Sequence, residues 1–270
     1  MADRRSRLVL PVLLALGAAV TLIPFAWMLA TSLTSDTDLT NPALVPSNPT
    51  LSAYRTLLAT LPFWRIVANS LGLAVAATAF QVVTSAMGGY AFARLRFPGR
   101  QVVFVMYLAT LMIPLQVLVV PLFVEMRYLN LVDTYAAVLA PTIASAFGVF
   151  LLRQAIAQVP TELDDAARVD GAGHLRIFLQ VIVPLVRPSL ATFAVFAFMA
   201  SWNSFLWPLV IIRSPEFMTL PVGLASLQGQ YATDWNVLMA GSVLSVVPIV
   251  LFYLLAQRHV IQGVALSGLK

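Results

Sequence analysis

The sequence predicts an all-α polytopic membrane protein with six transmembrane helices. Of its 270 residues, 60% are hydrophobic and 10% are charged, whereas soluble domains are about 45–50% apolar and about 25% charged. The apolar residues are also gathered into runs of about 20, the length that a helix needs to cross a bilayer. A chain of this composition cannot cover a water-facing surface with polar groups, so we expect membrane lipid to surround it.

The predicted spans are residues 8–33, 69–92, 101–123, 134–152, 185–212 and 237–256. The first follows three arginines, as a signal peptide does, but it exceeds the roughly 7–15 apolar residues of a signal core, so we expect it to be retained. The second is the least apolar and contains the small pair Gly88 and Gly89, which favours packing against other helices. We expect one transmembrane domain over residues 1–270.

The basic residues indicate the orientation of these spans. One set of alternate connections holds twelve of them: Arg4, Arg5, Arg7, Arg94, Arg96, Arg100, Arg153, Arg168, Arg176, Arg187, Arg258 and Lys270. The other set holds four: Arg55, Arg65, Arg127 and Arg213. Because positive charge favours the cytoplasmic side, both termini are predicted to be cytoplasmic. Basic residues placed between apolar runs do not suggest nucleic acid as a partner.

The connection 34–68 is predicted to lie outside, together with 213–236. It contains four prolines, which favour an extended path with turns over a folded domain: Pro42, Pro46, Pro49 and Pro62.

Several chemistries have no support in the sequence. The chain has no cysteine, which excludes disulfides, thiolate metal sites and a cysteine nucleophile, and we predict no metal site. An intramembrane protease needs a serine–histidine pair or paired carboxylates in the spans, but both histidines, His174 and His259, lie in predicted cytoplasmic segments. An ion-coupled secondary transporter is the alternative left open. Pro114, Pro121 and Pro248 could interrupt its helices, although acidic residues in the middle of spans are missing.

The cytoplasmic loop 153–184, between spans four and five, carries the clearest local signals. Thr161 followed by Asp164 has the form of a helix-capping box, and Glu162, Asp164 and Asp165 place negative charge in a first helical turn. Gly171 stands where such a helix ends, a position that favours glycine. We therefore predict a short helix before Gly171.

A second short helix is predicted from about Gly173 to Val183, before Pro184 at the entry to span five. Between the helix ends, Ala166 and Ala167 have no bulk, so another surface could approach the first helix closely. On local features alone, we favour an amphipathic connector resting on lipid headgroups.

The order of residues in this loop resembles the EAA loop of ABC importer permeases. The family pattern is Glu-Ala-Ala, three residues, Gly, nine residues and Ile-x-Leu-Pro. Here it reads Asp165-Ala166-Ala167, three residues, Gly171, nine residues and Val181-Ile182-Val183-Pro184. The spacing matches throughout, with aspartate in place of glutamate and valines in place of isoleucine and leucine.

Further segments resemble the carbohydrate-importing, maltose-type (MalG-like) branch of this family, the binding-protein-dependent inner-membrane components. They are Pro24-Phe-Ala-Trp27, Thr31-Ser32-Leu33, Asn69-Ser70-Leu71, Tyr90-Ala-Phe-Ala-Arg94, Phe97-Pro-Gly-Arg100, Trp202-Asn203-Ser-Phe-Leu-Trp207-Pro208, Gln257-Arg258 and Gly263. Together they cover nearly the whole chain. The resemblance implies the type I ABC importer permease fold.

The resemblance also implies a set of partners. They are a second, homologous permease subunit, a cytoplasmic ATPase dimer and an extracytoplasmic sugar-binding protein, in a bacterial or archaeal inner membrane. ATP and magnesium would be bound by the ATPase and no cofactor by this chain, which lacks a Gly-x4-Gly-Lys-Ser/Thr phosphate loop. This chain would then be a non-catalytic subunit.

The resemblance implies an ATPase-coupling surface formed by Glu162, Asp165, Ala166, Ala167 and Gly171. The tail from His259 to Lys270 either reaches toward the ATPase dimer, as the resemblance implies, or is a partly disordered end.

Two further groups have competing interpretations. Tyr90, Phe92 and Arg94 are expected to act as an interfacial aromatic and basic anchor. In span five, the candidates for the sugar pathway are Trp202, Asn203, Ser204 and Trp207, because aromatic faces and hydrogen-bonding groups suit sugars. The alternative for span five is that the polar groups bond neighbouring helices and the tryptophans pack.

Overall fold

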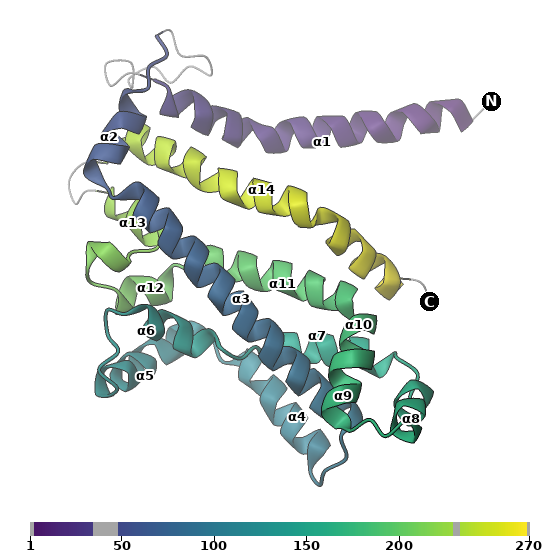
Figure 1. Ribbon diagram of the computed structural model, residues 1–270. Coiled ribbons are helices and arrows are strands. Elements are labelled where there is room, and N and C mark those ends of the chain that lie inside the picture. The colour runs from purple at the N-terminus through teal and green to yellow at the C-terminus, as the bar shows by residue number, and fades with distance from the viewer. Residues whose placement is uncertain (1–2, 35–47, 229–232, 269–270) are drawn as a thin grey trace. The chain divides into compact units, whose positions relative to one another are not determined.

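The computed structural model describes residues 3–34, 48–228 and 233–268. These residues form helices and connecting turns, and the strand-like pairing found among them is one isolated bridge between Gln228 and Thr233 (Figure 1). Side chains are described within 11–34, 48–228 and 233–252, and for Leu254. The predicted all-helical class is confirmed for this part of the chain.

The helices are labelled α, and η marks 3₁₀ helices except for the π-helical η4. In chain order they are α1 (Asp3–Ser32), α2 (Ser52–Thr60), α3 (Phe63–Arg94), α4 (Arg100–Ala109), η2 (Thr110–Met112), α5 (Leu115–Tyr128), α6 (Tyr135–Leu139), η3 (Ala140–Thr142), α7 (Ala146–Ala157), α8 (Glu162–Val169), α9 (His174–Ile177), η4 (Phe178–Ile182), α10 (Val183–Leu185), α11 (Arg187–Trp202), α12 (Leu206–Ile211), η5 (Pro215–Phe217), α13 (Leu220–Ser226) and α14 (Trp235–Gly268).

Within the described part of the chain, three helical stretches are long and apolar enough to cross a membrane as single helices: Pro11–Ser32, Phe63–Arg94 and Trp235–Phe252. They correspond to predicted spans one, two and six. If each of three bent helix pairs counts as one span, the total rises to six.

The bent pairs differ from the straight spans that hydropathy predicts. Within 101–123 the chain breaks at Ile113 and Pro114, and the helices on either side are bent by 100°. Pro114 has an extended backbone conformation and no N–H, so it ends one helix and begins the next. Within 134–152 the corresponding bend is 45°.

Predicted span five, residues 185–212, is also discontinuous. The segment His174–Leu185 meets α11 at an angle of 80°. α11 then ends at Trp202, and three residues separate it from the start of α12 at Leu206. The break contains Asn203 and Ser204, two of the predicted pathway residues.

The described residues fall into two compact units, the first comprising residues 1–63 and 223–248. In this unit Ser32 Oγ lies 2.9 Å from the hydroxyl of Tyr54 in α2, and Asn236 donates to the carbonyl of Thr34. By contrast, the apolar stretch from Pro11 to about Trp27 is exposed. The extended path predicted for 34–68 is wrong where α2 forms, and its residues 35–47 lie outside the described part of the chain.

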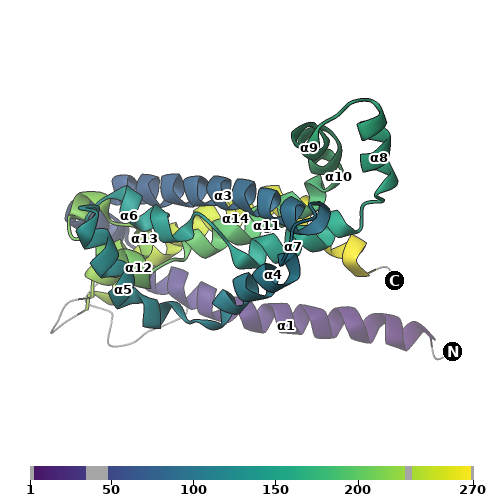
Figure 2. The ribbon, with the colours of Figure 1, turned by 90° about the horizontal axis from the view of Figure 1, so that it is seen from below.

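The second unit comprises residues 64–222 and 249–270. Here α3 crosses α7 closely, because a Cβ added to Gly89 would lie 2.9 Å from the backbone nitrogen of Arg153. The predicted packing role of Gly88 and Gly89 is thereby confirmed. Seen from below, α8, α9 and α10 project beyond one end of α3 (Figure 2).

The backbone of α14 is helical to Gly268, so the described part of the tail is not irregular. Its side chains at Tyr253 and from Leu255 onward lie outside the described residues, as do residues 269–270 entirely. The contact predicted for the tail therefore stays a prediction.

Candidate functional site

Helix α8 is the first of the two short helices predicted in the loop 153–184. It begins after Thr161, but the Thr161 side chain makes no capping hydrogen bond. The predicted capping box is therefore wrong. Its expected partner, the Asp164 side chain, turns instead toward Arg94 of α3.

The C-terminal end of α8 matches the prediction. Gly171 has a φ of +77°, in the left-handed region that glycine adopts without strain. Its N–H donates to the carbonyl of Arg168, and the N–H of Ala172 donates to that of Ala167. This pair of bonds is a Schellman motif, which satisfies the last carbonyls of the helix.

The residues of α8 divide between an exposed face and a buried one. Glu162, Asp165, Ala166 and Val169 are exposed, whereas Asp164 is 2% exposed. Ala167 is half-buried and packs against the hydrophobic cluster behind the helix. Of the two predicted small residues, Ala166 is therefore the one that another protein could approach.

The two adjacent aspartates have different environments. Asp165 lies 2.8 Å from Arg168, and both side chains are largely exposed. Such a pair contributes at most about 1 kcal/mol, because water and salt screen it. Asp165 is therefore free to exchange Arg168 for a residue of a partner.

Asp164 forms the buried ion pair of this region. Its Oδ2 lies 2.9 Å from Nε of Arg94, and the two side chains are 3% and 6% exposed. The Nε–H does not point at the carboxylate, so the contact is an ion pair without an aligned hydrogen bond. Arg94 also donates through Nη2 to the carbonyl of Val159. Sequence patterns missed this pair because its members are distant in the chain.

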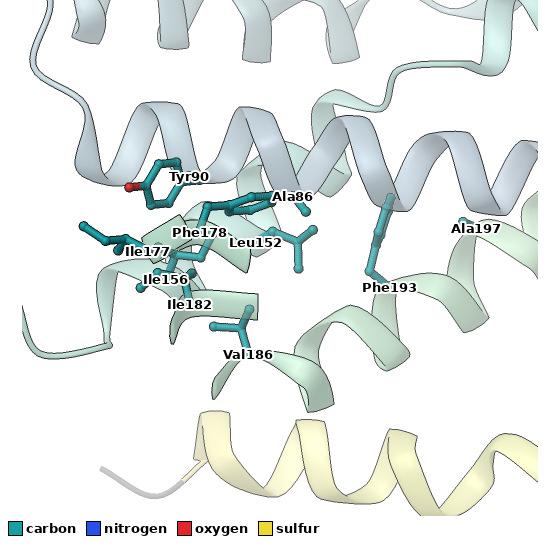
Figure 3. Packing of buried hydrophobic residues seen from close by; sticks show 10 residues of the cluster. All are labelled: Ala86, Tyr90, Leu152, Ile156, Ile177, Phe178, Ile182, Val186, Phe193 and Ala197. Atoms are coloured by element: carbon teal, nitrogen blue, oxygen red, sulfur yellow. The ribbon is translucent and has the colours of Figure 1, made fainter. Parts of the chain in front are cut away.

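A hydrophobic cluster, here called the junction core, packs against α8 through Ala167. Figure 3 shows its ten buried residues. The junction core is formed by Ala86 and Tyr90 of α3, Leu152 and Ile156 of α7, Ile177 of α9, Phe178 and Ile182 of η4, Val186, and Phe193 and Ala197 of α11. Helices α3, α7 and α11 are thus joined to the loop at one point, so a displacement of the loop is resisted by the packing of all of them.

The predicted interfacial anchor is wrong for this end of α3. Tyr90 is 6% exposed, packs against Phe178 at a ring-centroid distance of 5.2 Å, and lies 3.4 Å from His174 through its hydroxyl. Phe92 packs against Phe104. Together with the buried Arg94, these contacts hold protein segments together, because α9 and η4 cover the helix end.

A polar cavity of about 790 Å³ lies beside α8. It is lined by charged residues of α8, Asp164, Asp165 and Arg168, and by Arg94 of α3 and Arg96, among others. The loop is therefore packed tightly through the junction core and loosely on the side of its charged residues.

The four predicted pathway residues do not form one site. Trp202 is 3% exposed and stacks on Phe198, while Trp207 is 3% exposed and donates through its indole N–H to the carbonyl of Ala137. Asn203 is exposed and donates to the carbonyl of Met199. The tryptophans therefore pack, as the alternative interpretation held.

Ser204 differs from the other three because it lines a cavity. The cavity has a volume of about 120 Å³ and is bordered by polar side chains from several helices. These are Ser70, Gln81, Thr142, Ser201, Ser204 and Thr219. Gln81 and Ser201 were not among the predicted pathway residues, since polar residues in a span are also common at helix contacts.

Helices α5, α6 and α12 lie at the end of the second unit away from α8 (Figures 1 and 2). Hydrogen bonds that the sequence did not reveal connect the chain at this end. Asn69 donates to the carbonyls of Glu216 and Met218 and accepts from the hydroxyl of Tyr135. Asp133 has a φ of +64° and accepts from both backbone and hydroxyl of Ser214 and from the N–H of Arg213. Burial raises the pKa of Asp133, but these hydrogen bonds outweigh it, and the pKa lies below its ordinary value.

Among the residues that the structure describes, no group of three histidine or acidic side chains could hold a metal ion.

The sequence profile of one family, the binding-protein-dependent transport system inner membrane component, matches residues 82–266. The chain belongs to this family. It is therefore a multi-pass membrane component of an ABC importer, the permease subunit rather than the ATPase. An ion-coupled secondary transporter, the alternative left open by the sequence, does not fit this membership.

Two curated relatives are also permease proteins of sugar transport systems. The chain is 42% identical over 208 residues to the arabinooligosaccharides transport system permease protein AraQ of Halalkalibacterium halodurans, covering 77% of this chain and 75% of that protein. It is 33% identical over 250 residues to the lactose transport system permease protein LacG of Rhizobium radiobacter, covering 93% and 92%.

A solved structure shares the fold. It is a bacterial ABC transporter involved in the import of the acidic polysaccharide alginate, with a TM-score of 0.80 and 28% identity over 95% of this chain and 97% of that one. The predicted importer-permease fold is thereby confirmed.

Proposed function

We propose that this permease imports a sugar and that α8 couples it to a cytoplasmic ATPase. The observation that carries the proposal is the construction of α8. The helix is capped at Gly171, is supported by the junction core, and exposes Glu162, Asp165 and Ala166. A rigid helix with a small residue in its exposed face suits insertion into a cleft of another protein.

In this proposal ATP and magnesium are bound by the ATPase subunits. Closure of the ATPase dimer displaces α8, and the junction core passes the displacement to α3, α7 and α11. A second, homologous permease completes the pathway. The exposed apolar surface of α1 supports contact with that subunit and with lipid.

The orientation follows from charge. The twelve basic residues on the side of α8, against four on the other side, support a cytoplasmic α8 and cytoplasmic termini. An extracytoplasmic binding protein would then deliver the sugar to the opposite face.

The substrate class is inferred from the relatives, whose names specify arabinooligosaccharides and lactose. Within this chain, the break between α11 and α12 is the proposed point of contact with the pathway, because Asn203 is exposed there and Ser204 lines the 120 Å³ cavity. Trp202 and Trp207 would position this break by packing.

Reconstitution tests the function directly. The chain is purified with the partner permease, the ATPase and the binding protein and placed in proteoliposomes. Uptake of labelled arabinooligosaccharide, lactose and alginate oligosaccharide is measured separately. We expect uptake of at least one sugar that requires both ATP and the binding protein. Uptake driven by a proton or sodium gradient without ATP would overturn the proposal.

A further inference from the structure

The buried pair of Arg94 and Asp164 connects the proposed coupling helix to a long helix. Arg94 is the last residue of α3, and Asp164 lies in the first turn of α8. Their contact at 2.9 Å is almost fully shielded from water. A buried pair of this kind is strongly destabilised when one member is removed, because the other charge is left without compensation.

Arg94 holds the loop at a second point as well. Its Nη2 donates to the carbonyl of Val159, which lies just before α8. One guanidinium group therefore fixes both the approach to α8 and its first turn. Lysine could not do this in the same way, since it lacks the planar set of donors of arginine.

The pair is not in its strongest arrangement. Arginine and carboxylate often pair through two parallel hydrogen bonds, whereas here Nε of Arg94 and Oδ1 of Asp164 are buried without a hydrogen-bond partner. The cavity of about 790 Å³ borders both residues. The cavity leaves space beside the pair in which the two side chains can change their arrangement.

We infer that Arg94 is a positioning residue that transmits movement of α8 to α3 through its ion pair with Asp164, and that the pair changes between two arrangements during transport. The inference rests on the proposed coupling role of α8. The junction core keeps the helices together in both arrangements, while the ion pair sets the angle of α8 against the end of α3.

Neutral variants of each partner test this inference in the reconstituted transporter. Asp164→Asn retains the size of the side chain, Arg94→Gln retains a shorter polar side chain, and both remove the charge pair. We expect both to lower ATP-dependent uptake by about tenfold or more, while ATP hydrolysis continues, because the loss of a buried pair is worth at least that factor. Arg96→Gln is the matched control, since it removes an exposed arginine from the same cavity, and its uptake should remain normal.

A charge exchange tests whether uptake depends on the pair itself rather than on either side chain alone. The double variant Arg94→Asp with Asp164→Arg should recover part of the lost uptake, which neither single exchange does. Restoration by the exchange also supports the inference if the neutral variants fail to accumulate in the membrane. Uptake that is unchanged in Arg94→Gln, or equally absent in the single and double exchanges, would overturn it.

A cross-link separates this inference from the proposed function. A photoreactive group on Ala166→Cys should capture the ATPase subunit in both wild-type and Arg94→Gln backgrounds, but only the wild type should show a yield that changes with ATP. Failure of capture in both would contradict the proposed function. Capture with the same ATP dependence in both would overturn only the role of Arg94.

Discussion

Two neighbouring aspartates of α8 show that a shift of one position along a helix changes the surroundings of a side chain. Asp164 and Asp165 are chemically identical, yet one is buried against Arg94 and the other is exposed beside Arg168. The difference follows from the helical rotation of about 100° per residue, which directs consecutive side chains to different surroundings. Their spacing alone does not reveal which of the two is buried.

Gly171 gives a prediction at this scale. Gly171→Val should reduce uptake sharply, because a left-handed conformation costs a residue with a Cβ about 1–2 kcal/mol, a factor of about 5–30 in equilibrium. A Cβ there would meet open space, so the cost comes from the backbone alone. Gly171→Asn should retain much more activity, since asparagine tolerates this conformation. The measurement is uptake normalised to the amount of protein in the membrane, and equal uptake by both variants would contradict the account.

Asp133 gives a prediction about pH. Because its folded pKa lies below the ordinary value of 3.8, its stabilising contribution is present above the unfolded pKa and is lost as the pH falls through the folded pKa. The thermal stability of the purified protein should therefore fall between about pH 5 and pH 2 by an amount that depends on Asp133. Asp133→Asn, which tolerates the same backbone conformation, should show a shallower fall. Identical pH profiles would exclude this role.

At the scale of helices, some features could be predicted from the sequence and others could not. Gly171 ended α8 as expected, because helix ends are set by local backbone conformation. The predicted partner of Thr161 was wrong because Asp164 pairs with Arg94, about 70 residues earlier in the chain. Non-local contacts of this kind leave no mark in local spacing.

One of the breaks in the helices could be predicted from the sequence, and another could not. Hydropathy measures how apolar a segment is, but it does not report its direction, so the 100° bend at Pro114 was read as a straight span. Pro114 was a signal in the sequence that the helix could be interrupted there. The end of α11 at Trp202 had no comparable signal, and it separates the four predicted pathway residues.

The crossing of α3 and α7 gives a prediction at this scale. Gly89→Ala should destabilise the protein by about 1–3 kcal/mol, because the added methyl meets the backbone of α7 and cannot be accommodated by a side-chain movement. Gly72→Ala, in the same helix but with nothing within 4 Å of the added Cβ, should be neutral or stabilise by about 0.5–1 kcal/mol. Thermal unfolding in detergent measures both. Equal effects would show that the crossing is not close.

At the scale of the whole molecule, the composition and the order of motifs carried most of the information. They predicted a helical membrane protein of the importer-permease family, and the match over residues 82–266 confirmed it. The residues that hold the loop in place were harder to predict from the sequence, because the junction core brings together side chains from α3, α7, α9, η4 and α11, which are distant in the chain. The coupling role of α8 remains the central proposal.

The measurement that tests it most directly uses the absence of cysteine from the chain. A photoreactive group attached to Ala166→Cys, on the exposed face of α8, should capture the ATPase subunit in native membranes, with a yield that changes between nucleotide-free and ATP-bound states. Leu58→Cys, an exposed position in α2 on the predicted opposite side, is the control and should not capture it. If Ala166→Cys is labelled freely from the cytoplasm and captures no ATPase in either state, α8 is a solvated connector and the coupling proposal is wrong.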